Sequence, residues 1–190
     1  MNRTSRFPAE GLHTERITLH LANRRYAEAL QSYYTANRAH LKPWEPLRPR
    51  SFYTLQSIEN RLEAMERQME TESALYLLLF RRDGGQLIGD CNFTNIVRGP
   101  FQACHLGFSI ARDYEGQGLM RECLATAIEY VFGELGLHRI MANYRPENER
   151  SARLLTGLRF EREGIARAYL KLNGAWADHV LTSLINPTDC

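Results

Sequence analysis

The sequence predicts an α/β (α+β) fold in which helices pack on one large, mostly antiparallel sheet. Segments of alternating apolar residues indicate strands, and segments with apolar residues at helical spacing lie between them. Two glycine-containing turns each join a pair of strands as a hairpin. The 190 residues, 44% of them hydrophobic, are enough to bury a core. We expect one domain over residues 1–190, with loosely ordered ends at about 1–11 and 187–190.

The N-terminal part of the chain predicts one strand followed by two helices. Residues 14–22 alternate as a strand does, with three apolar residues on one face. Asn23 is a suitable N-cap for a helix over 23–38. Three prolines then interrupt the helical pattern, and an apolar stripe at helical spacing predicts a second helix over 55–72.

The central part predicts three strands in a row. Residues 74–82 and 86–97 are joined by Asp83-Gly84-Gly85, a good hairpin turn, and a third strand covers 103–111. A helix, a strand, a second helix and a hairpin turned on Asn173-Gly174 then follow, over residues 116–135, 137–145, 148–158, 165–172 and 175–184. The sequence thus predicts a sheet of about seven strands flanked by about four helices.

Bulk properties exclude several classes of protein. A net charge of +2 gives no sign of binding to DNA or to a membrane surface, and neither is expected. No segment resembles a signal peptide or reaches membrane-spanning length. The four cysteines and six histidines lack metal-ligand spacing, so no metal is expected, and three cysteines lie in apolar surroundings. A cytoplasmic protein is the expectation.

The loop that opens the helix at residue 116 is the first candidate site. Gly116 and Gly118 follow an apolar strand, so the main-chain N–H groups of residues 116–121 can form an anion cradle at a helix N-terminus. The loop lacks the lysine of a P-loop and the third glycine of a dinucleotide fingerprint. An ordinary strand-to-helix turn is the alternative on this motif alone.

Two neighbouring segments favour a ligand. In the strand before the loop, three apolar side chains share one face, and the opposite face is small and polar, with room for a ligand: His105, Gly107 and Ser109. Asn148 and Ser151 lie at the start of a later helix.

Several motifs together resemble a known family. The segments "LKPWEP", "GFSI", "GQGLM", "HRIMANYRPENERS" and "DHVLT" are similar to those of the GNAT acyl-CoA-dependent N-acetyltransferases, and within them of the RimJ-type ribosomal-protein-alanine N-acetyltransferases. The resemblance runs from about Leu12 to Pro187. It implies the GNAT fold, acetyl-CoA as co-substrate, and transfer of acetyl to a protein N-terminal α-amine.

The resemblance also assigns binding roles to residues of this chain. It implies that the 115–120 loop holds the pyrophosphate of coenzyme A and that the main chain of 108–110 pairs with the pantetheine arm. The implied cofactor-binding residues are Phe108, Ser109, Ile110, Gly116, Gln117, Gly118, Leu119, Met120, Arg121 and Asn148. Trp44 and Glu45, bounded by prolines, are the candidates for binding the acceptor, although Trp44 has an alternative role as a cap on the core.

Two residues are candidates for catalysis. Ser151 stands where related enzymes place a hydroxyl near the thioester sulfur, and its alternative role is to satisfy the helix end. His105 stands where many relatives have a glutamate base, and its alternative role is a structural hydrogen bond. A peptide α-amine has a pKa of about 7.7–8.0 against about 10.4 for lysine, a difference of roughly 3.4 kcal/mol, so a weak base suits an N-terminal amine.

The sequence departs from the family pattern at three positions. Glu115 replaces the usual Gln or Arg, Met120 replaces the final small residue of the loop, and Leu155 stands where many relatives have a tyrosine acid. We therefore expect acetyl transfer to the N-terminal alanine of a ribosomal protein by direct attack in a ternary complex. The alternatives are transfer to a small-molecule amine and a non-catalytic ribosome-assembly protein. Whether the acceptor is met free or in association with the ribosome stays open.

Overall fold

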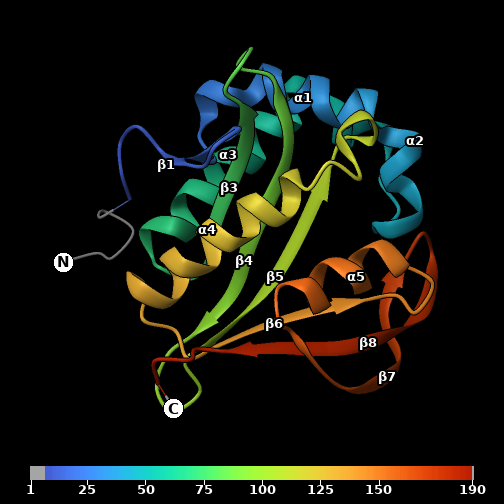
Figure 1. The fold of residues 1–190 in the computed structure, drawn as a ribbon. Helices are drawn as coiled ribbons and strands as arrows, with labels where there is room; N and C mark the ends of the chain where they lie inside the picture. Colours follow the sequence, from blue (N-terminus) through green and yellow to red (C-terminus); the bar gives the residue numbers. More distant parts are fainter. Residues whose placement is uncertain (1–6, 190) are drawn as a thin grey trace.

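An eight-stranded sheet forms the centre of the protein, in the order β1-β2-β3-β4-β5-β6-β8-β7 (Figure 1). The structure is a computed structural model that describes residues 7–189. Neighbouring strands are antiparallel except β5 and β6, which run parallel. The predicted mixed, mostly antiparallel sheet is confirmed, with a two-residue strand β1 (Leu12–His13) added at its edge.

The strands that the sequence predicts are all present. They are β2 (Ile17–Leu21), β3 (Leu75–Arg81), β4 (Leu87–Val97), β5 (Ala103–Ile110), β6 (Arg139–Tyr144), β7 (Glu161–Leu172) and β8 (Ala175–Ile185). Both predicted hairpins are confirmed, since β3 pairs with β4 and β7 with β8. Strand β7 begins four residues earlier than predicted, and two register irregularities interrupt its pairing with β8.

The helices follow the predicted order with shifted starts. They are α1 (Ala27–Ala36), the short α2 (Arg38–Leu41), α3 (Leu55–Glu70), α4 (Leu119–Gly133) and α5 (Glu149–Gly157). Asn23 does cap a helix, because its side chain accepts from the Arg25 N–H at 3.0 Å, but the capped turn is a 3₁₀ helix, η2 (Arg24–Tyr26). Helix α4 begins three residues later than predicted because Gly116 and Gly118 have positive φ angles, which end helical geometry.

Helices cover both faces of the sheet (Figure 1). Helix α4 lies over one face of the N-terminal half of the sheet, and α1 and α3 lie together over the other face. Strand β3 is therefore buried on both sides, with Leu77, Leu78 and Leu79 each at most 2% exposed. The buried apolar side chains of both faces form one cluster, which holds β5 and the start of α4 in fixed positions.

Contacts reach the described residues near both ends of the chain. The Phe7 ring packs edge-on against Tyr130 with 5.2 Å between centroids, and Asp189 lies 3.5 Å from His138. The remainder of the predicted loose ends, residues 1–6 and 190, lies outside the described part of the chain.

The cysteines behave as the sequence predicts. Cys91, Cys104 and Cys123 are buried and free, and Cys190 lies outside the described residues. Burial raises the pKa of the Cys104 and Cys123 thiols to about 12, so these thiols stay protonated near neutral pH. Over residues 7–189, no helix is both long and apolar enough to cross a membrane.

Candidate functional site

The sheet splits between β5 and β6. These strands pair only over Ala103–His105 and Arg139–Met141, after which β5 continues along β4 and β6 continues along β8. Figure 1 shows the two strands diverging from this point. Residues 106–110 of β5 therefore have no strand partner on the β6 side within the described chain. An extended ligand can pair with such an open edge as an added strand would.

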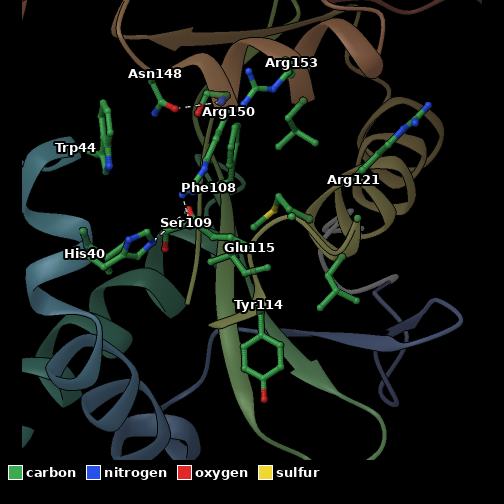
Figure 2. A pocket seen from close by; sticks show the side chains of 18 of the residues that line it. His40, Trp44, Phe108, Ser109, Tyr114, Glu115, Arg121, Asn148, Arg150 and Arg153 are labelled. Carbon is green, nitrogen blue, oxygen red and sulfur yellow. Dashed lines mark hydrogen bonds and ion pairs between the residues drawn. The ribbon is translucent and has the colours of Figure 1, made fainter. Parts of the chain in front are cut away.

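A cavity of about 500 Å³ lies at the open side of this fork. Figure 2 shows it with Trp44 and His40 on one side, Asn148, Arg150 and Arg153 along the top, and Arg121 on the opposite side. Twelve of the fourteen predicted site residues line it: Trp44, Glu45, Phe108, Ser109, Ile110, Gly116, Gly118, Leu119, Met120, Arg121, Asn148 and Ser151. The two that do not are His105 and Gln117.

The glycine loop leaves the start of α4 open. Gly118 is the N-cap residue with a φ of +77°, and it supplies no side-chain cap. The first-turn N–H groups of α4 are therefore available to an anion, and the helix dipole adds attraction. Gln117 points elsewhere: its side chain donates to the Asp113 carbonyl at 2.8 Å, and its own carbonyl accepts from Arg16.

Glu115, the departure from the family pattern, is neutralised by neighbours from other helices. One carboxylate oxygen forms an ion pair with Arg150 on α5, and the other lies 3.5 Å from Nε2 of His40 on α2. The side chain is only 19% exposed and links the two sides of the cavity. The carboxylate therefore does not leave this end of the cavity acidic.

Basic side chains surround the same end of the cavity. Arg121 reaches from α4 to the Gly157 carbonyl at 3.2 Å, and Arg153 pairs with Glu149 at 3.1 Å. Arg150 and Arg153 are site residues that the sequence reasoning missed. Their spacing was an available signal, because side chains three apart share a helix face.

Asn148 and Ser151 meet as the sequence predicts. The Asn148 side chain accepts from the Ser151 N–H at 3.1 Å, which caps α5 and places the Ser151 side chain on the cavity wall. Leu155 is 1% exposed and belongs to the core, whereas its neighbour Leu154 lines the cavity. Leu155 therefore offers no group to the cavity.

The opposite end of the cavity is formed by the proline-bounded loop. Trp44 ends the 3₁₀ helix η3 (Lys42–Trp44), is 39% exposed, and has the Arg145 guanidinium 5.9 Å from its ring centroid. The Glu45 carbonyl accepts from the Asn173 N–H at 2.9 Å, which joins the tip of the β7–β8 hairpin to this loop. Burial raises the pKa of the Glu45 carboxyl, and Arg48 lies 3.6 Å away.

A network that the sequence reasoning missed lies behind this end. Ser109 shares a hydrogen bond of 2.8 Å with the Tyr33 hydroxyl. Asp90 on β4 is 6% exposed and accepts from the Tyr34 hydroxyl at 3.2 Å and from the Asn92 amide at 3.1 Å. Burial raises the pKa of the Asp90 carboxyl to about 6. No local sequence signal pairs these residues, because they come from three separate segments.

His105 lies at the base of the fork, where the pairing of β5 and β6 ends opposite Met141. Its Nδ1 is buried and has no hydrogen-bond partner among the described residues. Burial lowers the pKa of its imidazole, so the ring is neutral near pH 7. The predicted structural hydrogen bond is therefore not seen at Nδ1, and the predicted catalytic role stays a prediction.

The described residues do not contain the ligand set of a metal site. Within residues 7–189, no three His, Cys, Asp or Glu side chains lie close enough together to hold a metal ion.

Sequence comparison connects this geometry to known proteins. The profile of a family described as "Acetyltransferase (GNAT) domain" matches residues 16–161. The chain is 45% identical over 183 residues to the [ribosomal protein uS5]-alanine N-acetyltransferase of Escherichia coli, which covers 96% of this chain and 94% of that protein.

Solved structures show the same fold. The ribosomal-protein-S5-alanine acetyltransferase from Vibrio fischeri superposes with a TM-score of 0.89 at 39% identity, covering 93% of this chain and 96% of that one. Mycobacterium smegmatis RimJ, solved in complex with CoA-disulfide, superposes with a TM-score of 0.86 at 26% identity. That match covers 90% of this chain and 83% of the other.

Proposed function

This chain belongs to the GNAT acetyltransferase family, and from that premise we propose that it acetylates the N-terminal α-amine of a ribosomal protein. The acyl donor is acetyl-CoA, and the acceptor residue is alanine. The names of the relatives from Escherichia coli and Vibrio fischeri support this acceptor. Their similarity covers nearly the whole chain, including both ends of the cavity. The reaction then takes place where ribosomal proteins are made, in the cytoplasm, and association with the ribosome is part of the proposal.

The observation that carries the proposal is the fork between β5 and β6, with its open strand edge and its two unlike ends. The N–H groups at the start of α4 and the basic side chains Arg121, Arg150 and Arg153 suit the phosphates of coenzyme A. The open edge at 108–110 suits the pantetheine arm, whose amides alternate donors and acceptors. The thioester then lies between Ser151 and the end of the cavity that is lined by Glu45.

Ser151 is the proposed partner of the leaving thiolate. Its main-chain N–H is fixed by Asn148, and its hydroxyl is on the cavity wall. A hydroxyl at this place can donate to the sulfur as the C–S bond breaks. The main-chain N–H of Phe108 is the proposed donor to the carbonyl oxygen, on which negative charge develops during attack.

Trp44 and Glu45 are the proposed acceptor-binding residues. Trp44 walls the entrance, and the Glu45 carboxylate attracts the α-ammonium group that must reach the thioester. Direct attack in a ternary complex needs no covalent enzyme intermediate, and holding the amine beside the thioester supplies part of the rate.

The test is to incubate the protein with acetyl-CoA and unmodified ribosomal proteins and to measure their N-terminal masses. We expect one acetyl group on a protein that begins with alanine and none on a matched set of internal lysine peptides. Acetylation of small amines alone would refute the acceptor. Stabilisation by coenzyme A without any turnover would refute the enzyme activity for α-amines.

A further inference from the structure

Ser109 stands between the cavity and a buried carboxylate. In the antiparallel pairing of β4 with β5, Asp90 lies directly opposite Ser109, so both side chains are on the same face of the sheet. The two strands approach closely here: a Cβ added to Gly89 would lie only 2.3 Å from the Ser109 carbonyl oxygen. Ser109 lines the cavity and Asp90 does not, so Ser109 forms the wall in front of Asp90.

Among the described residues, the Asp90 carboxylate forms no ion pair. None of the ion pairs within residues 7–189 includes Asp90, and its hydrogen-bond donors, Tyr34 and Asn92, are neutral. A buried charge without an opposite charge is costly for stability, and such groups concentrate at functional sites. Because Asp90 lies beside the acceptor end of the cavity, it is placed to take part in the reaction of the amine.

We propose that Asp90 is a positioning residue of the acetyl transfer and accepts, through the Ser109 hydroxyl, the proton released by the acceptor amine. This inference rests on the proposed function. A serine hydroxyl has one donor and two acceptor sites. With Tyr33 on one acceptor site and the O–H turned toward Asp90, one acceptor site stays open to the amine.

The proton balance is complete without another reactant. The α-ammonium gives one proton to Ser109 as the Ser109 proton moves to the Asp90 carboxylate, which leaves a neutral amine. Its lone pair forms the C–N bond with the thioester carbonyl carbon, and the C–S bond breaks with its electron pair on sulfur. The second amine proton passes to the thiolate, and Asp90 releases its proton to water when the products leave.

The ionisable groups around Asp90 determine how its protonation changes with pH. Tyr33 and Tyr34 from α1 and Glu45 from the proline-bounded loop interact electrostatically with Asp90, as does Cys91, the next residue on its strand. The nearby arginines, Arg48 and Arg61, act on Glu45 and Tyr34. Burial raises the pKa of both tyrosines and of Cys91, so these groups stay protonated near neutral pH. The proton acceptors left in this region are the two carboxylates, of which Glu45 is tied to Arg48.

The experiment is the pH dependence of kcat/KM for a peptide with N-terminal alanine, from pH 5 to pH 9. It compares wild-type protein with Asp90→Asn, Ser109→Ala and His105→Gln, and with Asp83→Asn as an exposed control. An amine with a pKa of about 7.8 is roughly 5% neutral at pH 6.5 and mostly neutral at pH 9. Without Asp90 the reaction must use that fraction, so we expect a loss of about 20-fold at pH 6.5 that shrinks to about threefold or less at pH 9.

The outcomes separate this inference from its rivals. Ser109→Ala is expected to behave like Asp90→Asn, and it carries the test should Asp90→Asn not fold, because it leaves the carboxylate in place. A loss of equal size at every pH would mean a structural role for Asp90 and overturn the inference. An acidic limb that moves only in His105→Gln would assign the proton to His105. A wild-type protein that acetylates no α-amine would overturn the proposed function and this inference together, whereas an active wild type with unchanged variants would overturn the inference alone.

Discussion

At one end of the cavity, main-chain N–H groups at the start of α4 and three arginines face the ligand space; at the other, the carboxylates of Glu45 and Asp90 lie beside Ser109. The first end is built mainly from one continuous loop and helix, with side chains of α5 added. The second end draws on four segments that are far apart in the sequence. Under the proposed function, holding the cofactor depends mainly on a local stretch of the chain, whereas preparing the amine depends on tertiary packing.

Under the proposed function, the opposite charges of the two ends would also orient the reactants. Phosphates are attracted to the arginine end and repelled from the carboxylates, and an ammonium group behaves in the opposite way. One cavity can therefore hold a negatively charged cofactor and a positively charged acceptor in only one arrangement. Variants at the arginine end should change the affinity for acetyl-CoA, and variants at the carboxylate end should change the KM for the acceptor. The predictions on Gly118 and Glu45 below depend on this difference.

The largest expected effect is the stability that the fold loses as Asp90 ionises. Its folded pKa of about 6 is raised above the unfolded value, so the folded state binds more protons between pH 4 and pH 6. Ionisation in this range destabilises the fold, by about 3 kcal/mol in total. Asp90→Asn should therefore gain stability relative to wild type as pH rises from 4 to 7, as measured by urea unfolding. A difference between the two proteins that does not change with pH would contradict this prediction.

Ser151→Ala should separate chemistry from cofactor binding. We expect kcat to fall about 100-fold, because a donor to the thiolate is lost, while the Kd for acetyl-CoA changes less than about twofold. Steady-state kinetics and calorimetry measure the two quantities. Thr156→Ala, exposed on the same helix, is the matched control. Equal turnover in Ser151→Ala and wild type would remove Ser151 from the chemistry.

Gly118→Ala should weaken the phosphate end alone. A φ of +77° costs a residue with a Cβ about 1–2 kcal/mol, so we expect acetyl-CoA to bind about tenfold more weakly with little change in acceptor KM. Gly133→Ala at the other end of α4 is the control, because an added Cβ meets nothing within 4 Å and its φ is not left-handed. Unchanged binding in Gly118→Ala would show that this backbone geometry does not hold the cofactor.

Glu45→Gln should weaken the acceptor end alone. Loss of a half-buried carboxylate facing an ammonium group is expected to raise the acceptor KM about fivefold and to leave the acetyl-CoA Kd unchanged. Glu63→Gln on α3 removes the same charge at an exposed place and serves as the control. A change in acetyl-CoA affinity instead would mean that the two ends are not independent.

Glu115→Gln has the smallest expected effect and the opposite sign. Removing this carboxylate frees Arg150 and takes a negative charge away from the phosphates, so acetyl-CoA should bind about twofold to threefold more tightly at low salt. The gain should disappear at high salt. Weaker binding at low salt would show instead that Glu115 serves to orient Arg150 and His40.

Much of the fold and of the cofactor end could be predicted from the sequence, because the signals are local. Strand alternation, hairpin turns and the capping of α5 by Asn148 depend on neighbours within a few residues. The same holds for the glycine loop, whose conformation and helix start are set by Gly116 and Gly118. The start of α4 differs from the prediction because two positive φ angles delay it, and the starts of α1 and β7 differ as well.

What the tertiary structure alone decided is the arrangement of side chains across the fork. The pairing of Glu115 with Arg150 and His40, and of Ser109 with Tyr33 and Asp90, joins residues up to 76 positions apart. The sheet register and the packing of α1 on β4 set these contacts, and neither follows from any short segment. The sequence by itself determined where a cofactor can be held. The packing decided which groups surround Ser109 and Asp90, because burial and long-range contacts, not residue type alone, set their charge.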